Sequence, residues 1–306
     1  MDRQSSEQFW RRALQVWSCC LSGNGNSVVV QLTNGFGNNV FQLVAARLLA
    51  EKHGRKVQAV LPWADYYGLN ELSNVWVGGV EVTAGLASNQ AVFVNDDNYA
   101  AAMTQDSMPD CNIVVRGHFE DYRYFVENRE LIKSWFEPVG KTNDRDLVFH
   151  FRTGDRLFMR NEFEYKPSSD SYREAIESFD FDRLHIVSDL PELRRYTPEE
   201  LGSLKFHNDV DASKSVGHED AAEYLNSVVD ALLQFEPVFE PASISEDFDK
   251  IRSFDNIMFE HGTMSWWAAF LSEASSIGVR KDWRPWKGHS NKNLSKVPIE
   301  GWFEWR

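Results

Sequence analysis

Short runs of aliphatic and β-branched residues alternate along the chain with longer stretches that carry apolar residues at helical spacing. This alternation is typical of an α/β fold, in which strands and helices follow one another along the chain. The clearest case joins the run 28–32 to the stretch 39–53, and Gly54 ends that stretch as a helix C-terminal cap would. We therefore expect an α/β protein.

The same pattern predicts a domain boundary within 137–146, where Pro138, Gly140 and a polar run follow a helical stretch and precede a new strand. The two parts would be an N-terminal Rossmann-like domain, 1–140, and a C-terminal Rossmann-like domain, 141–306. Further strands are predicted at 57–61, 91–94, 113–116, 147–151, 183–187, 256–259 and 277–280. Further helices are predicted at 121–136, 169–179, 218–235 and 264–274.

Composition excludes several classes of protein. The chain has 306 residues with 46 acidic and 32 basic side chains, a net charge of −14 that repels nucleic acid and anionic membranes. Its three cysteines form neither a disulfide framework nor a zinc-binding spacing. The apolar stretch 13–21 predicts a short amphipathic helix, because it is too short to cross a bilayer and no cleavage site follows it. We expect a soluble cytoplasmic protein, without signal peptide or membrane anchor, of a bacterial or viral type.

The first of three motifs, residues 34–42, lies between the first strand and the first long helix. Gly35 and Gly37 let the backbone turn sharply and let a ligand approach it closely. The amides at the helix start would face an anion. The motif lacks the third glycine of a dinucleotide-binding fingerprint and the lysine of a P-loop. A tight strand–helix turn capped by asparagine fits the same residues.

The second motif, His150–Asp155, ends the strand that opens the second half. An arginine at the end of a strand places a guanidinium at the carboxyl edge of the sheet, where it can hold phosphate oxygens bidentately. Asp155 is placed either to orient Arg152 or to serve as a carboxylate in the site. A purely structural Arg–Asp pair is the alternative.

The third motif, 261–271, joins a strand to a helix through a turn of Gly, Thr and Ser residues. Thr263 and Ser265 fall where N-cap hydroxyls and free amides would bind a diphosphate. A plain N-cap is the alternative. We expect Trp266 and Trp267 to be structural in either case.

Together the motifs resemble fucosyltransferases that share an H-x-R-x-G-D peptide, most closely the α-1,2-fucosyltransferase family. That family carries G-x-G-N-Q-x-F-Q, then H-V-R-R-G-D-Y, and finally N-S-T-F-S-W-W-A-A. The matching segments here are 35–42, 150–155 and 261–269. Segment 117–125 is similar to the family's G-Y-F-Q-x-x-x-Y-F, and weaker matches fall in order at 186–189, 246–259 and 281–283.

The resemblance implies a glycosyltransferase-B fold, two Rossmann-like domains facing a central cleft, with the acceptor on the N-terminal side and the nucleotide in the C-terminal half. It implies inverting, metal-independent transfer of fucose from GDP-fucose to a hydroxyl of a glycan acceptor. Arg152 would bind the β-phosphate, and Arg152 and Asp155 are the catalytic candidates. The donor-binding residues that it implies are Gly35, Gly37, Asn38, His150, Arg152, Ser188, Asp189, Thr263, Met264 and Ser265.

Physical chemistry fits this mechanism. A departing GDP gains negative charge, which an arginine and a helix N-terminus can stabilise in place of Mg²⁺. The four Asp-x-Asp triplets, at 144/146, 180/182, 209/211 and 247/249, indicate solvated faces in so acidic a chain. We therefore expect no metal and no other cofactor, and we expect a sugar nucleotide and a glycan as partners, with no nucleic acid.

The departures from the family pattern leave alternatives open. Thr153 replaces the second arginine of the H-x-R-R-G-D peptide and Asn39 replaces a glutamine. His261, Gly262 and Met264 replace asparagine, serine and phenylalanine. The donor could accordingly be UDP-xylose or another sugar nucleotide, or the chain could be a glycan- or nucleotide-binding module that has lost transfer.

The general base is a separate question. Inversion needs a group that takes the proton of the acceptor hydroxyl, unless the departing phosphate or water takes it. Asp155, Glu162 and Glu164 are candidates because they follow Arg152. Asp155 stands first among them, with orientation of Arg152 as its alternative role.

Overall fold

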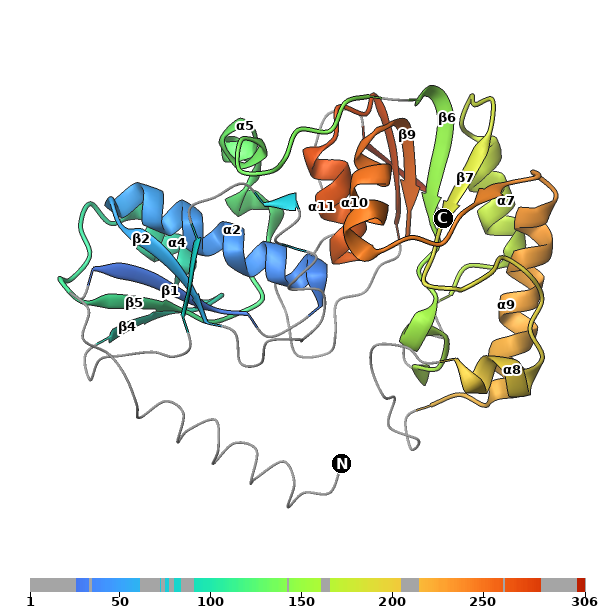
Figure 1. The fold of residues 1–306 in the computed structure, drawn as a ribbon, viewed down its shortest axis with the longest axis horizontal. Coiled ribbons are helices and arrows are strands. Elements are labelled where there is room, and N and C mark those ends of the chain that lie inside the picture. The colour runs from blue at the N-terminus through green and yellow to red at the C-terminus, as the bar shows by residue number, and fades with distance from the viewer. Residues whose placement is uncertain are drawn as a thin grey trace, which may run out of the picture. The chain divides into compact units, whose positions relative to one another are not determined.

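The structure, a computed structural model, describes residues 26–32, 35–60, 72, 75–76, 80–83, 91–141, 143–160, 166–204, 215–260, 262–281 and 302–305. The chain divides into two compact units, Met1–Glu137 and Pro138–Arg306. Each unit is built on its own sheet, and every pair of neighbouring strands in both sheets is parallel (Figure 1). The predicted α/β class with two Rossmann-like halves is confirmed.

The sheet of the first unit has the order β3-β2-β1-β5-β4. Its strands are β1 (Ser27–Gln31), β2 (Lys56–Val60), β3 (Val80–Thr83), β4 (Ala91–Val94) and β5 (Asn112–Val115). Helix α2 (Phe36–His53) follows β1 and ends at Gly54, whose φ of 61° is the left-handed conformation expected of a glycine cap. Helix α4 (Tyr99–Thr104) is tied to α2 because the Tyr99 hydroxyl donates to the Ala45 carbonyl at 2.9 Å.

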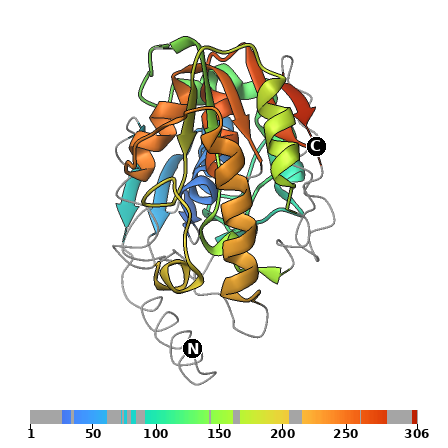
Figure 2. The same cartoon turned by 90° about the vertical axis from the view of Figure 1, so that its right-hand side faces the viewer.

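The sheet of the second unit has the order β11-β10-β9-β6-β7-β8. Its strands are β6 (Asn143–His150), β7 (Leu184–Val187), β8 (Val238–Phe239), β9 (Phe254–Phe259), β10 (Ser276–Arg280) and β11 (Trp302–Trp305). Its helices are α7 (Ser169–Glu177), α8 (Pro198–Ser203), α9 (His218–Leu233), α10 (Ile244–Arg252) and α11 (Thr263–Leu271). Helices α10 and α11 lie on one face of the sheet, and α7 and α9 lie on the other (Figures 1 and 2).

Side-chain alternation along β6 assigns its residues to the two faces. Phe149 and the following Phe151 join the buried cluster that includes Tyr172 of α7, while His150 points the opposite way and contacts α11. On α11 itself, Trp266 and Trp267 are buried, which confirms their structural role.

The helix predicted for 121–136 is wrong. The segment forms two 3₁₀ turns, η1 (Tyr122–Tyr124) and η2 (Val126–Asn128), and then the short α5 (Arg129–Lys133). The Asp121 carboxylate accepts the Arg123 amide and so starts a turn there, while Phe125 is buried against Phe41 of α2 with ring centroids 5.5 Å apart. Packing of the aromatic side chains therefore overrides the helical spacing of this segment.

The remaining predicted strands and helices are present, with their ends shifted by a few residues. The predicted amphipathic helix at 13–21 lies outside the described residues. Within the described part of the chain, the structure contains no helix that combines the length and the apolar character needed to span a bilayer.

Candidate functional site

The order of strands in the second sheet identifies one place as special. From β6 the chain builds β7 and β8 on one side, whereas β9, β10 and β11 lie on the other side. Parallel α/β sheets bind ligands at the carboxyl ends of the strands where the order reverses in this way. Here that point is the carboxyl edge between β6 and β9, and the second and third motifs follow these two strands.

Arg152 is held at this edge by two carboxylates. Its Nη1 atom lies 2.7 Å from Asp189 Oδ2, and its Nη2 atom lies 2.9 Å from Asp155 Oδ1. The Asp155 side chain is only 4% exposed, whereas the Arg152 side chain is 28% exposed. The guanidinium is therefore fixed in direction but still reachable by a ligand.

Gly154 allows Asp155 to fold back onto Arg152. Its φ is 45°, in the left-handed region that favours glycine, and it starts the 3₁₀ turn η3 (Gly154–Leu157). Of the roles considered for Asp155, this geometry suits the orientation of Arg152.

Thr153 is completely buried and holds Asp189. Its amide donates to Asp189 Oδ1 at 2.9 Å, and its hydroxyl donates to the same oxygen. Burial would raise the pKa of Asp189, but the Arg152 charge and the two bonds from Thr153 outweigh it and keep that pKa below its usual value. The buried Ser188 hydroxyl lies 3.3 Å from the Thr153 hydroxyl.

His150, two residues before Arg152, is buried and bonded through Nδ1 to the Ser265 hydroxyl of α11. Burial lowers the pKa of His150 to about 4, the Arg152 charge adds to this effect, and Asp189 opposes it. The imidazole is therefore neutral at physiological pH. The pair also links β6 to α11 across the point where the strand order reverses.

The start of α11 faces the same strand end. Gly262 is its N-cap residue and, as a glycine, has no side chain with which to cap the helix. Thr263 and Met264 are half-buried there, while the fully buried Ser265 uses its hydroxyl on His150. A Cβ atom at Gly262 would lie 3.2 Å from Ser265 Oγ, so a larger residue would crowd that pair. The first amides of a helix have no partner within the helix and can bind an anion.

The glycine motif of the first unit differs from the predicted turn. Helix α2 begins at Phe36, with Gly35 as an exposed N-cap residue, so Gly37 and Asn38 belong to the first helical turn. Gly37 is buried and Asn38 is half-buried. These residues lie at the carboxyl end of β1, in a unit separate from Arg152.

Asp247, in the first turns of α10, belongs to the Asp-x-Asp triplet 247/249, which was expected to mark a solvated face, and it was not among the predicted site residues. Burial raises its pKa to about 6, Lys250 opposes the rise, and the neighbouring charges of Glu246 and Asp189 add to it. The charge of Asp189, which binds Arg152, thus acts on Asp247. The available signal was the S-x-x-E capping box of Ser243 and Glu246, which marks a helix start beside it.

Some candidates cannot be placed: Glu162, Glu164 and His261 lie outside the described residues. Among the residues that are described, no three His, Cys, Asp or Glu side chains are positioned to share a metal ion.

No protein family model matches the chain, and no curated protein is similar to it. Several solved structures are similar in part. Fucosyltransferase NodZ from Bradyrhizobium is 11% identical, with a TM-score of 0.44 over 82% of this chain and 95% of that one. NodZ α-1,6-fucosyltransferase soaked with GDP-fucose is 12% identical, with a TM-score of 0.45 over 82% and 94%.

A mutant of Arabidopsis thaliana FUT1 in complex with GDP is 9% identical, with a TM-score of 0.41 over 91% of this chain and 75% of that one. The two NodZ structures are fucosyltransferases. With identities this low and TM-scores below 0.5, these similarities are too weak to give this chain an activity.

Proposed function

We propose that the protein is an inverting, metal-independent glycosyltransferase that moves fucose from GDP-fucose to a hydroxyl of a glycan acceptor. The observation that carries the proposal is the position of Arg152, a part-exposed guanidinium fixed at the point where the strand order of its sheet reverses. The resemblance of its H-x-R-x-G-D peptide to that of fucosyltransferases is the reason for proposing GDP-fucose as the donor.

The chemistry asks for positive potential at the leaving group. When the bond between the anomeric carbon and the diphosphate breaks, negative charge develops on the departing oxygen. Arg152 supplies a full positive charge there, and the start of α11 supplies amides and the positive end of a helix dipole. Both groups are fixed before substrate binds, so little reorganisation is needed during the reaction.

The other residues of the site have supporting roles. Asp155 and Asp189 orient the Arg152 guanidinium, and Thr153 fixes Asp189. The neutral His150 helps to shape the pocket for the guanine base of the nucleotide. Its bond to Ser265 keeps the start of α11 against β6. Direct displacement of the diphosphate by an acceptor hydroxyl on the opposite face of the sugar inverts the anomeric carbon.

Two experiments test this function. Calorimetric titration with GDP and with UDP should show clear preference for GDP, whereas preference for UDP would assign a different sugar nucleotide. Tight GDP binding without any cleavage of GDP-fucose would instead favour a binding module that has lost transfer.

Substitution then tests the arginine. Arg152→Ala should abolish both GDP binding and cleavage of GDP-fucose while thermal unfolding still shows a folded protein. Arg145→Ala is the matched control, because Arg145 lies toward the start of the same strand and also pairs with an aspartate, Asp182, at 3.0 Å. Full activity of Arg152→Ala would overturn the role assigned to Arg152.

A further inference from the structure

The strand β11 lies at the edge of the second sheet, beside β10, and carries three aromatic side chains. Because successive side chains of a strand point to opposite faces, Phe303 and Trp305 share one face and Trp302 lies on the other. Phe303 packs against Phe179, just after α7, with ring centroids 5.0 Å apart. Trp302 packs against Phe259, the last residue of β9, with centroids 5.9 Å apart. The strand is therefore attached to the rest of the unit on both of its faces.

The Trp305 side chain reaches across a neighbouring strand. Trp305 is the register partner of Arg280 on β10, and β10 separates β11 from β9. Its indole Nε1 nevertheless donates to the Phe259 carbonyl on β9 at 3.2 Å. Trp305 is only 5% exposed, its ring centroid lies 5.7 Å from that of Tyr172, and its own carbonyl accepts the Lys281 amide at 2.7 Å. The indole N–H is thus fixed in place from several sides.

The Phe259 carbonyl stands at the start of the connection to α11. Only three residues separate the end of β9 from the first residue of α11. The last of them, Gly262, accepts the Trp266 amide at 2.9 Å in the first hydrogen bond of the helix. The first of them, Glu260, is held from β10, since its Oε2 atom lies 3.7 Å from Arg280 Nη1 and both side chains are buried. The edge strands therefore fix the chain as it enters α11.

The direction of the helix start matters for binding an anion. The first amides of α11 bind phosphate oxygens only when their N–H bonds point at those oxygens, because a hydrogen bond weakens steeply as its angle closes. If the end of β9 were free to move, the start of α11 would sample other directions and bind an anion less tightly. The Trp305 bond to the Phe259 carbonyl restricts that movement.

We propose that Trp305 is a positioning residue of the nucleotide site. By holding the Phe259 carbonyl, its indole N–H keeps the start of α11 directed at the diphosphate. This inference rests on the proposed function, which supplies the diphosphate as part of GDP. Trp305 acts through the backbone between β9 and α11, and it takes no part in the transfer itself.

The substitution Trp305→Phe tests this role, because it keeps an aromatic ring beside Tyr172 and removes the N–H. The Kd for GDP, measured by calorimetry, should rise about threefold to tenfold, which corresponds to the net contribution of one hydrogen bond. In the absence of nucleotide, hydrogen exchange of the Trp266 amide should become faster, because amides at a helix end exchange by local opening.

Phe303→Leu is the matched control. Phe303 lies on the same strand and the same face as Trp305, but it packs against Phe179 instead of binding β9. The control should lower the free energy of unfolding and leave both the Kd for GDP and the exchange of the Trp266 amide at wild-type values. Replacement of Trp305 by 3-benzothienylalanine, in which sulfur takes the place of the N–H, keeps the shape of the indole. It should raise the Kd as Trp305→Phe does, and it serves as the test if Trp305→Phe fails to fold.

The outcomes separate this inference from the proposed function. Wild-type affinity for GDP in the Trp305 variants would overturn the role of Trp305 and leave the function standing. An equal rise of the Kd in Phe303→Leu would also overturn it, because the effect would then follow stability and not the bond to Phe259. If the wild-type protein neither binds GDP nor cleaves GDP-fucose, the proposed function fails and the role in nucleotide binding fails with it. Unchanged exchange of the Trp266 amide in the Trp305 variants would overturn the inference whatever the nucleotide.

Discussion

Thr153 occupies the position at which the fucosyltransferases that this chain resembles have a second arginine. Its contacts explain what a threonine does there. The side chain is buried, and both its amide and its hydroxyl bind Asp189. Asp189 in turn holds Arg152. The second cation is thus replaced by a residue that orients the first one.

The prediction for Thr153 follows from that bond. Thr153→Val keeps the shape but removes the hydroxyl, so it should lower the free energy of unfolding by about 1–3 kcal/mol. It should also weaken GDP binding, because Asp189 no longer holds Arg152 firmly. Denaturant unfolding and calorimetry measure the two effects. Thr153→Ser, which keeps the hydroxyl, is the control, and an equal loss of GDP affinity in both variants would contradict the explanation.

His150 gives a pH dependence of stability. The unfolded imidazole binds a proton below about pH 6.5, but burial keeps the folded one neutral down to a pKa of about 4. Between these values the unfolded state binds more protons, so the free energy of unfolding falls as the pH falls through this window. The full effect is about 3 kcal/mol.

His150→Asn removes this titration, so as the pH falls from 6.5 to 4 its free energy of unfolding should fall less, or rise more, than that of the wild type. Urea unfolding at several pH values measures it. Asp247 titrates in the same range with the opposite sign, because its pKa is raised to about 6. The difference between variant and wild type, in which Asp247 cancels, is therefore the quantity to compare. Parallel curves would show that His150 does not titrate as described.

The candidate site was partly predictable from the sequence. His150, Arg152 and Ser265 come from two motifs 115 residues apart, His150 to Ser265, and the structure brings them together at one sheet edge. The sequence did not assign Asp247 to this site, because its interaction with Asp189, which lies on a different element, arises only in the folded chain.

At the scale of elements, strands were predicted better than short helices. A buried parallel strand is a compact aliphatic run, as in Val28–Val30, and its local pattern is enough to predict it. The strands β3, β8 and β11 were not predicted. Helices α8 and α10 were missed although both start with a capping box, at Thr197 and Ser243. Each has at most nine residues, so the apolar periodicity on which the prediction relied had little length in which to show.

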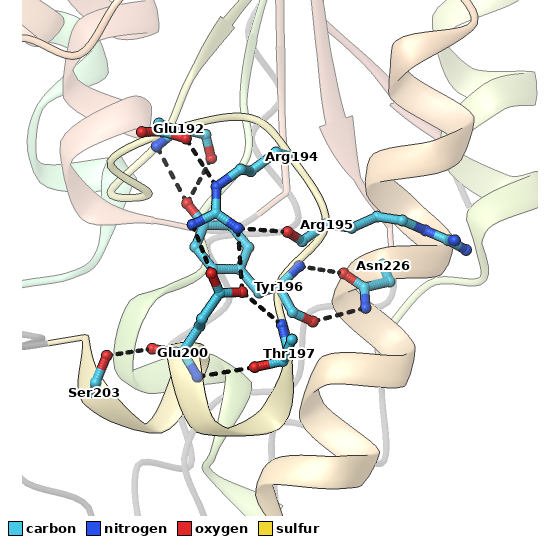
Figure 3. A network of polar contacts seen from close by, with 8 residues as sticks. All are labelled: Glu192, Arg194, Arg195, Tyr196, Thr197, Glu200, Ser203 and Asn226. Carbon is cyan, nitrogen blue, oxygen red and sulfur yellow. Dashed lines mark hydrogen bonds and ion pairs between the residues drawn. The ribbon is translucent and has the colours of Figure 1, made fainter.

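The segment before α8 is joined to α9 by a network of polar contacts (Figure 3). Asn226 of α9 brackets the Tyr196 backbone, accepting its amide at 2.9 Å and donating to its carbonyl at 2.9 Å. Arg194 binds Glu200, whose carboxylate also accepts the Thr197 amide at 2.9 Å in the capping box. One side chain, Asn226, thus replaces two backbone hydrogen bonds between these elements.

Asn226→Ala should therefore cost about 1–3 kcal/mol of the free energy of unfolding, because it leaves part-buried backbone groups of Tyr196 unpaired. Denaturant unfolding measures the loss. Ser227→Ala, one residue further on the same helix, removes only a bond to the Tyr224 carbonyl within the helix and should change stability by less than ~0.5 kcal/mol. A loss in Ser227→Ala as large as that in Asn226→Ala would argue against the bracket.

At the scale of the whole molecule, a bound nucleotide should slow amide hydrogen exchange in the two sheets to different extents. Arg152 and the two carboxylates that bind it belong to the second unit. GDP at 100 times its Kd should stabilise the state that binds it by about 2.7 kcal/mol. Amide hydrogen exchange should slow in β6, β9 and α11, and much less in β1, β2 and α2. In Arg152→Ala, GDP should slow exchange in neither unit. Equal protection of both sheets in the wild type would contradict a nucleotide site in the second unit.

The two carboxylates that hold Arg152 also determine how a donor arrives. Asp155 and Asp189 compensate the arginine charge at a distance, so an approaching dianion meets mainly the field of a chain with a net charge of −14. Raising the ionic strength from about 0.01 to 0.15 M shortens the Debye length from about 30 to 8 Å and screens that repulsion. The association rate constant of GDP, followed by stopped-flow tryptophan fluorescence, should therefore rise with salt. A site whose arginine charge was uncompensated would attract the nucleotide over long range, so its association rate constant would fall as salt is added.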